Sequence, residues 1–198
     1  MPLRARLQRD WRFLRGLSRT LARVKSIRPD SPNLLCDDVE AAVVRWRDRP
    51  ALTFEGRTVT YGELDAMANR FANWGQTLNL RRGQTVALFM PNRLEYFVIW
   101  YGLSKIGVVT ALINNQLTGS ALAHCLNIAG ASHVLLDADT APVFEAARPL
   151  LDKPLQQWVL GPVRGDQRDL GQALKSCSSL APDRRIREDI MARETAIQ

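Results

Sequence analysis

The chain has 198 residues, of which 46% are apolar, and its formal net charge is +7 at pH 7. This length and apolar content are typical of one globular domain with its own core, and no apolar stretch is long enough to predict a membrane-spanning helix. Three widely spaced cysteines without a C-x-x-C pair argue against a disulfide framework and a zinc site, and they fit a reducing, cytoplasmic compartment.

The positive charge is concentrated at the N-terminus. Residues 1–28 contain nine Arg or Lys and one Asp, a net charge of +8, which leaves −1 for the other 170 residues. A basic surface spread over the whole domain, as binding to a phosphate backbone would require, is therefore excluded. We expect no nucleic acid partner.

Residues 1–28 have the pattern of a basic amphipathic helix, which we call the leader. At about 100° per residue, apolar side chains fill an arc of roughly 140° and arginines take the opposite side. Such a helix suits an anionic membrane surface, where apolar side chains enter the headgroup layer and arginines meet its charge. We therefore expect peripheral attachment to a membrane through Leu3, Leu7, Trp11, Leu14, Leu17, Leu21, Arg4, Arg12, Arg15 and Arg19.

Two other interpretations of the leader stay open. An amphipathic helix can pack on its own domain and leave its arginine face in solvent. Cleavable targeting peptides are also rich in Arg and poor in acidic residues. A secretory signal is disfavoured, because arginines interrupt any apolar segment of the leader.

After the leader, a cluster of Pro, Asp, Ser and Asn predicts a linker over residues 29–38. The globular part then covers residues 39–198 and opens with a short helix that ends before Pro50. An alternating segment with a turn at Glu55-Gly56 predicts a hairpin. Thr60 and Glu63 then predict a capping box for a helix that buries Leu64, Met67, Ala68 and Phe71.

From residue 84 onward, short apolar strands alternate with helices. Strands are expected over residues 85–90, 108–113, 133–137 and 155–160, and helices over residues 94–106, 118–129 and 140–151. Beyond residue 161 the chain is polar and is expected to form loops with one or two short helices. This alternation predicts an α/β fold, a doubly wound and mostly parallel sheet with flanking helices on both faces.

Motifs that carry chemistry are scarce. The sequence contains no G-x-G-x-x-G, no Walker-type loop, no G-x-S-x-G and no H-E-x-x-H. At the strand ends, Asn92 is expected to cap the following helix, and Asn114 and Asn115 lie where a ligand could bind but are also ordinary loop residues. The His124-Cys125 pair is expected to be buried and structural. We therefore predict no catalytic, cofactor-binding or metal-binding residue in this chain.

Three segments resemble the N-terminal part of the adenylate-forming acyl-CoA synthetase superfamily. They are "RPALTFEGRTVTYGELDAMANRFANWG", "VALFMPNRLEYFVIWYGLSKIGVVTALINNQLTGSALAHCL" and "ASHVLLD". The phrases "MPNRLEY", "GLSKIG", "ALINNQLTG" and "LAHCL" are most similar to the fatty acid transport protein and very-long-chain acyl-CoA synthetase branch. "TYGEL" is shared by the whole superfamily. The resemblance covers residues 30–160.

The resemblance implies a long- or very-long-chain fatty acid–CoA ligase, active in lipid metabolism and fatty acid uptake. Such a ligase uses ATP and Mg²⁺ to form an acyl-adenylate and then transfers the acyl group to CoA. In such a ligase, the phosphates of ATP are bound by a Ser/Thr/Gly-rich loop, by later acidic and aromatic segments and by a lysine of a C-terminal domain. None of these is present here. We therefore expect an N-terminal subdomain, truncated before the phosphate loop, that binds no cofactor alone and has the rest of the ligase chain as its partner.

Two alternatives remain at this stage. A chain with this leader and a complete α/β core is also compatible with a non-catalytic, membrane-attached interaction module derived from a ligase. An aryl or short-chain acid ligase is disfavoured by "ALINNQLTG", although the acid pocket lies outside the chain.

Overall fold

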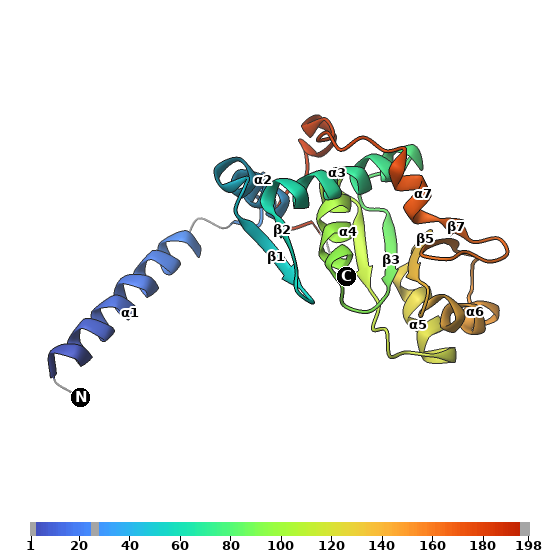
Figure 1. Ribbon diagram of the computed structural model, residues 1–198, viewed down its shortest axis with the longest axis horizontal. Coiled ribbons are helices and arrows are strands. Elements are labelled where there is room, and N and C mark those ends of the chain that lie inside the picture. The colour runs from blue at the N-terminus through green and yellow to red at the C-terminus, as the bar shows by residue number, and fades with distance from the viewer. Residues whose placement is uncertain (1–2, 25–27, 195–198) are drawn as a thin grey trace.

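The computed structural model describes residues 3–24 and 28–194, and within the first range it describes the side chains of residues 10, 11 and 13–21. Residues 28–194 form an α/β body. Helix α1 (Leu3–Val24) extends away from this body (Figure 1).

Helix α2 (Leu35–Trp46) begins four residues before the predicted helix. The linker expected over residues 29–38 is therefore wrong in its second half. Leu34 precedes the helix in extended backbone, and its N–H donates to the Asp37 carboxylate at 2.8 Å. A carboxylate at the third helical position stabilises a helix start in this way, and the polar composition of the segment concealed it.

The predicted hairpin is confirmed. Strands β1 (Pro50–Phe54) and β2 (Arg57–Thr60) are antiparallel, and both turn residues have positive φ, 47° at Glu55 and 78° at Gly56. Two residues of positive φ give the turn whose twist matches that of paired strands. The hairpin therefore leads directly into the next helix.

Helix α3 (Tyr61–Thr77) begins with the predicted capping box. The Thr60 N–H donates to Glu63 Oε2 at 2.8 Å, and the Glu63 N–H donates to Thr60 Oγ1 at 3.2 Å. Two backbone donors at the helix start are thereby satisfied. Of the expected stripe, Leu64, Ala68 and Phe71 are buried, while Met67 is half-buried.

The sheet confirms the expected fold class. Five parallel strands lie in the order β4-β3-β5-β6-β7. Their bounds are β3 (Thr85–Phe89), β4 (Val109–Leu112), β5 (His133–Asp137), β6 (Gln156–Leu160) and β7 (Arg168–Asp169). Strand β7 has two residues and lies in the polar region expected to form loops, so the alternating pattern missed it.

Helices cover both faces of the sheet (Figure 1). They are α4 (Leu94–Ser104), α5 (Gly119–Ala129), α6 (Ala141–Ala147) with the 3-10 turn η1 (Arg148–Leu150), and α7 (Leu170–Lys175), followed by the 3-10 turn η2 (Arg184–Arg187). Side chains of β3 alternate between two cores: Val86 and Leu88 pack with α3 and α4, whereas Ala87 and Phe89 pack with α5 and α6. This two-sided burial explains why the strands are apolar throughout.

Helices α3 and α4 approach each other closely at Gly102. A Cβ atom at this position would lie 2.3 Å from the Ala68 carbonyl oxygen and 2.8 Å from Phe71 Cβ. Because the first neighbour is backbone, rotation of a side chain cannot relieve the overlap. Glycine therefore sets the distance between the two helices.

We predict that Gly102→Ala lowers the free energy of unfolding by about 1–3 kcal/mol or more, because overpacking moves helix backbone. Urea unfolding followed by circular dichroism measures this change. Gly171→Ala in α7 is the matched control, since its Cβ would lie 3.3 Å from Asp169 Oδ1 and displace only a side chain. Equal stability of the two variants would contradict the close-contact argument.

Candidate functional site

The carboxyl edge of the sheet is where a doubly wound protein is expected to bind a ligand. The chain passes from β3 to β4 on one side and from β5 to β6 on the other. The carboxyl ends of β3 and β5 therefore border the topological switch point, the usual ligand crevice of this fold.

The side chains at this switch point are bonded to one another. Asp137 Oδ1 accepts the Thr140 N–H at 2.9 Å, and the Thr140 hydroxyl lies 2.7 Å from the Phe89 carbonyl oxygen, which joins the ends of β5 and β3. Arg93 Nη1 lies 3.7 Å from Asp137 Oδ2, and Arg93 Nε donates to Glu95 at 2.8 Å. Partial burial by itself raises the pKa of Glu95, but the hydrogen bond and charge of Arg93 outweigh it and lower that pKa.

Other residues singled out by the sequence have local roles. The expected cap of α4 by Asn92 is wrong. The residue at the cap position is Arg93, one residue later, and no side chain caps this helix. Asn114 Oδ1 accepts the Gln116 N–H at 3.0 Å, a turn-forming bond. The expected burial of the His124-Cys125 pair is wrong, because His124 is exposed and Cys125 is half-buried on α5.

A buried cation lies on the other side of the body, where α2, α3 and α4 meet. Lys105 is fully buried, and its ammonium donates to Asp65 Oδ1 at 2.7 Å and to Asn69 Oδ1 at 2.6 Å and lies 3.2 Å from Glu40 Oε1. The ammonium also lies 4.8 Å from the centre of the Tyr101 ring. A buried charge is tolerated only when partners surround it in this way.

A second buried cation extends this network into the C-terminal part of the chain. Arg187 is 4% exposed; its guanidinium pairs with Glu40, donates to Asp37 at 3.0 Å and donates to the Lys105 carbonyl at 3.3 Å. Asp37 and Glu40 belong to α2, so Arg187 ties the turn η2 to that helix. The sequence pattern did not predict that Lys105 and Arg187 would be buried as ion pairs. Several of their contacts join residues more than 60 positions apart in the sequence.

The segment after α7, which we call the strap (residues 176–194), lies across α3 and α2. Arg70 Nη1 donates to the Cys177 carbonyl at 2.7 Å, and Asn73 donates to the carbonyls of Ser178 and Leu180. Further on, backbone N–H groups of residues 192 and 193 donate to the carbonyls of residues 31 and 29, each at 2.8 Å. The first part of the segment expected as a linker is therefore bonded to the strap through Pro29 and Ser31.

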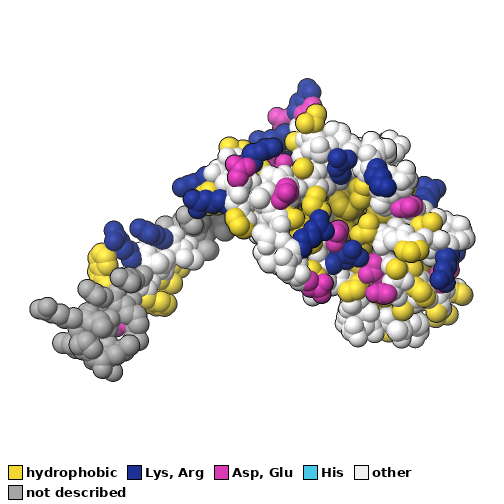
Figure 2. Space-filling model, in the orientation of Figure 1, with side chains coloured by type: hydrophobic (Ala, Val, Ile, Leu, Met, Phe, Trp, Pro, Cys, Tyr) yellow, Lys and Arg dark blue, Asp and Glu magenta, His cyan; other side chains and the backbone are white. Residues whose placement is uncertain are grey.

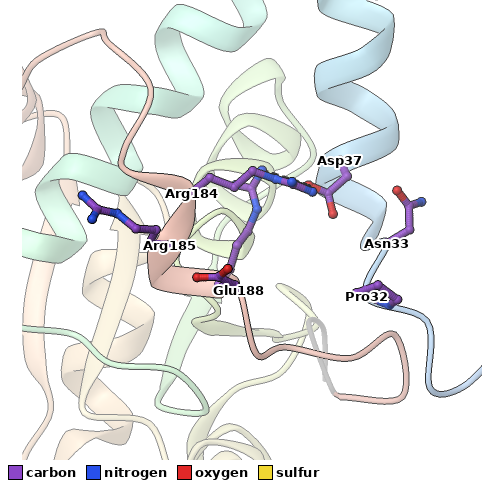
Figure 3. A pocket seen from close by; sticks show the side chains of 7 residues that line it. Pro32, Asn33, Asp37, Arg184, Arg185 and Glu188 are labelled. Atoms are coloured by element: carbon purple, nitrogen blue, oxygen red, sulfur yellow. Dashed lines mark hydrogen bonds and ion pairs between the residues drawn. The ribbon is translucent and has the colours of Figure 1, made fainter.

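A cavity of about 460 Å³ lies between the strap and the start of α2 (Figure 3). Its lining residues are Pro32, Asn33, Asp37, Arg184, Arg185, Arg187 and Glu188. Its arginines are already paired: Arg184 and Arg187 lie 2.9 and 3.0 Å from Asp37, and Arg185 pairs with Asp183. The lining charge is compensated, so the cavity does not have the excess positive charge of an anion site. Among the described residues, no group of three or more His, Cys, Asp or Glu could hold a metal ion.

Helix α1 presents its described side chains to solvent. The exposed fractions of its apolar residues are 61% for Trp11, 60% for Leu14, 43% for Leu17 and 53% for Leu21. Phe13, which the predicted stripe omitted, is 68% exposed. The side chains of Leu3, Leu7, Arg4 and Arg12 lie outside the described residues, whereas Arg15 and Arg19 are exposed and Arg15 stacks on Trp11 at 4.8 Å. Among the described helices, none combines the length and apolarity needed to cross a bilayer.

Comparison with protein families identifies the class of protein. The family model described as "AMP-binding enzyme" matches residues 39–191, which is most of the body. The chain therefore belongs to the AMP-binding enzyme family. The resemblance noted in the sequence is thereby confirmed.

Relatives narrow this assignment. A "Long-chain-fatty-acid--CoA ligase" of Escherichia coli O6:H1 is 34% identical over 142 residues, which cover 71% of this chain and 25% of that protein. "Long-chain fatty acid transport protein 6" of Mus musculus is 34% identical over 110 residues, which cover 54% of this chain and 17% of that protein. The chain spans about a quarter of the length of the first of these relatives.

A solved structure agrees with these relatives. The N-terminal domain of FACL13 from Mycobacterium tuberculosis is similar to this structure with a TM-score of 0.65 at 26% identity. The match covers 76% of this chain and 38% of that one. The observed α/β body therefore corresponds to part of an N-terminal domain in an enzyme of known fold.

The Asp37 contacts predict a pH-dependent stability. Partial burial alone raises the pKa of Asp37, but hydrogen bonds from the Leu34 N–H and Arg184, with the charge of Arg187, hold it below its ordinary value of 3.8. A lowered pKa in the folded state adds stability above pH 3.8, and this stability is lost as the pH falls through the lower folded value. We predict that Asp37→Asn costs about 1.5–3 kcal/mol at pH 7 and less at pH 3.

Urea unfolding of both proteins at the two pH values measures this difference. Asp152→Asn is the control, since Asp152 is exposed and, among the described residues, only its backbone N–H takes part in a hydrogen bond, to Asn127. A loss of stability that is the same at both pH values would show that Asp37 acts through packing and not through its charge.

Proposed function

We propose that this chain is the N-terminal part of a long- or very-long-chain fatty acid–CoA ligase. The observation that carries the proposal is the 34% identity to a ligase with that activity over 71% of the chain, on a body that the AMP-binding enzyme family matches over residues 39–191. Fatty acid and CoA are the substrates of the proposed complete enzyme, and the rest of the ligase chain is the main partner of this body.

ATP and Mg²⁺ are the proposed cofactors of the complete enzyme. ATP would activate the fatty acid carboxylate as an acyl-adenylate, with Mg²⁺ accompanying the ATP. The residues described here do not fit the phosphates. At the switch point the backbone donor of Thr140 is used by Asp137, and Arg93 is used by Glu95 and Asp137. Phosphate binding needs free backbone amides or cations, so we assign it to other parts of the ligase. The body acts as a rigid platform for them.

We predict that the 198-residue chain alone releases no pyrophosphate from ATP in the presence of palmitate and CoA, and forms no palmitoyl-CoA. The reason is that the backbone donor of Thr140 and the guanidinium of Arg93, at the switch point where a nucleotide would bind, are already used by Asp137 and Glu95. A coupled pyrophosphate assay and mass spectrometry of the thioester test this expectation, with a complete fatty acid–CoA ligase as the positive control. Turnover above the blank without protein would overturn it.

We also propose that the leader holds the protein peripherally at an anionic membrane surface on the cytoplasmic side. Support comes from the exposed apolar side chains of α1 and from the +8 charge of residues 1–28. Insertion of exposed Trp and Leu side chains into the headgroup layer removes apolar area from water, and arginines add attraction to anionic lipids. The alternative in which this helix packs on its own domain is not supported by the exposure of its described side chains.

We predict that replacing Leu14, Leu17 and Leu21 together by Gln lowers binding to phosphatidylglycerol vesicles by about tenfold or more, since each buried Leu contributes more than 1 kcal/mol. The variant keeps every charge of the leader, so sedimentation with vesicles isolates the apolar contribution. Thr20→Gln, on the polar side of the helix, is the control. Unchanged sedimentation of the triple variant would exclude membrane insertion of the apolar stripe.

A further inference from the structure

A second basic and aromatic surface lies at the junction of α2, β1 and α3. We call residues 44–49 the arginine corner; they are Val44, Arg45, Trp46, Arg47, Asp48 and Arg49. All six residues are exposed, Val44 to 87% and Trp46 to 37%. Arg45 stacks on the Trp46 ring at 5.0 Å. Arginines, an indole ring and an aliphatic side chain therefore share one exposed turn.

The backbone of the arginine corner is fixed although its side chains are in solvent. The Gly62 N–H donates to the Arg47 carbonyl at 2.8 Å, and the Tyr61 N–H donates to the Arg49 carbonyl at 3.0 Å. The Trp46 and Tyr61 rings lie 6.0 Å apart. The start of α3 thus holds the corner in place, so that a partner would meet a preformed surface at little cost in backbone order.

The corner brings several unpaired arginines together. Among the described residues, Arg45, Arg47 and Arg49 form no ion pair and lie within five residues of one another. Elsewhere on the body some exposed or half-exposed arginines are paired, Arg82 with Glu194, Arg93 with Glu95, Arg148 with Asp166, and Arg185 with Asp183, and others, such as Arg81 and Arg164, are not. Asp48 offsets one of the three charges, which leaves a net charge of +2 on residues 44–49. The negative end of α2 accounts for about half of one charge, not for two.

We propose that the arginine corner is a second contact with an anionic phospholipid surface, an inference that rests on the proposed membrane attachment of the leader. The chemistry is that of the leader repeated on the body: unpaired guanidinium groups for lipid phosphates, with Trp46 and Val44 for the boundary between headgroups and acyl chains. Figure 2 shows Lys and Arg side chains on several parts of the visible face of the body, among them the part nearest to α1. Two contacts on one chain bind one surface more tightly than either contact alone.

The test uses the full chain and phosphatidylglycerol–phosphatidylcholine vesicles. The corner variant carries Arg45→Gln, Arg47→Gln and Arg49→Gln. The matched control carries Arg81→Gln, Lys153→Gln and Arg164→Gln, which remove the same charge from other exposed positions. A third variant replaces the corner arginines with Lys and keeps the charge. Because each basic residue near the surface contributes about 1 kcal/mol, the corner variant should bind about tenfold or more weakly, while the control and the Lys variant stay within about twofold of the original chain.

The outcomes separate this inference from the proposed function. If the original chain does not bind the vesicles, the membrane attachment itself fails. If the original chain binds and the leader variant is weakened, but the corner variant behaves like its matched control, only the second contact is overturned. The second contact is also overturned if the corner variant loses binding to soluble heparin but keeps its binding to vesicles. The corner would then serve a polyanionic partner and not a lipid surface. Equal urea unfolding curves for all variants show that each one is folded.

Discussion

The buried ammonium of Lys105 is the interaction on which the arrangement of α2, α3 and α4 depends. Lys105 follows α4 directly, and its ammonium is surrounded by Glu40 of α2 and by Asp65 and Asn69 of α3. A buried cation without such partners would cost several kcal/mol. The Glu40 carboxylate is shared with Arg187, so the same charge balance reaches the strap. Because Lys105 and Arg187 share Glu40, and Arg184 and Arg187 share Asp37, removal of one member changes the charge balance around the others.

This network also determines how the leader joins the body. Arg187 attaches the strap to α2, and the strap then pairs its backbone with residues 29–31. The segment directly after the leader is therefore part of the folded body and not a free tether.

Much of the fold was predictable from local signals. The Glu55-Gly56 turn, the Thr60-Glu63 capping box and the strand–helix alternation depend on residues close together in sequence, and all are present. The early start of α2 and the short strand β7 were missed, because both lie in polar segments without an apolar period. The Arg187 and Lys105 network could not be predicted, since it joins residues up to 150 positions apart, and only the fold brings them together.

The distribution of ion pairs separates structural charge from charge that is left for a partner. Inside the body, cations such as Lys105 and Arg187 are enclosed by carboxylates, and at the switch point Arg93 is held by Glu95 and Asp137. The charges of these groups are neutralised by carboxylates, and in this proposal nucleotide binding is assigned to other parts of the ligase. Three unpaired arginines lie together on the surface at the corner, where the sequence showed only an ordinary "RWRDR". A folded body that neutralises its internal charges and leaves this group unpaired is suited to a partner that is itself an extended anionic surface.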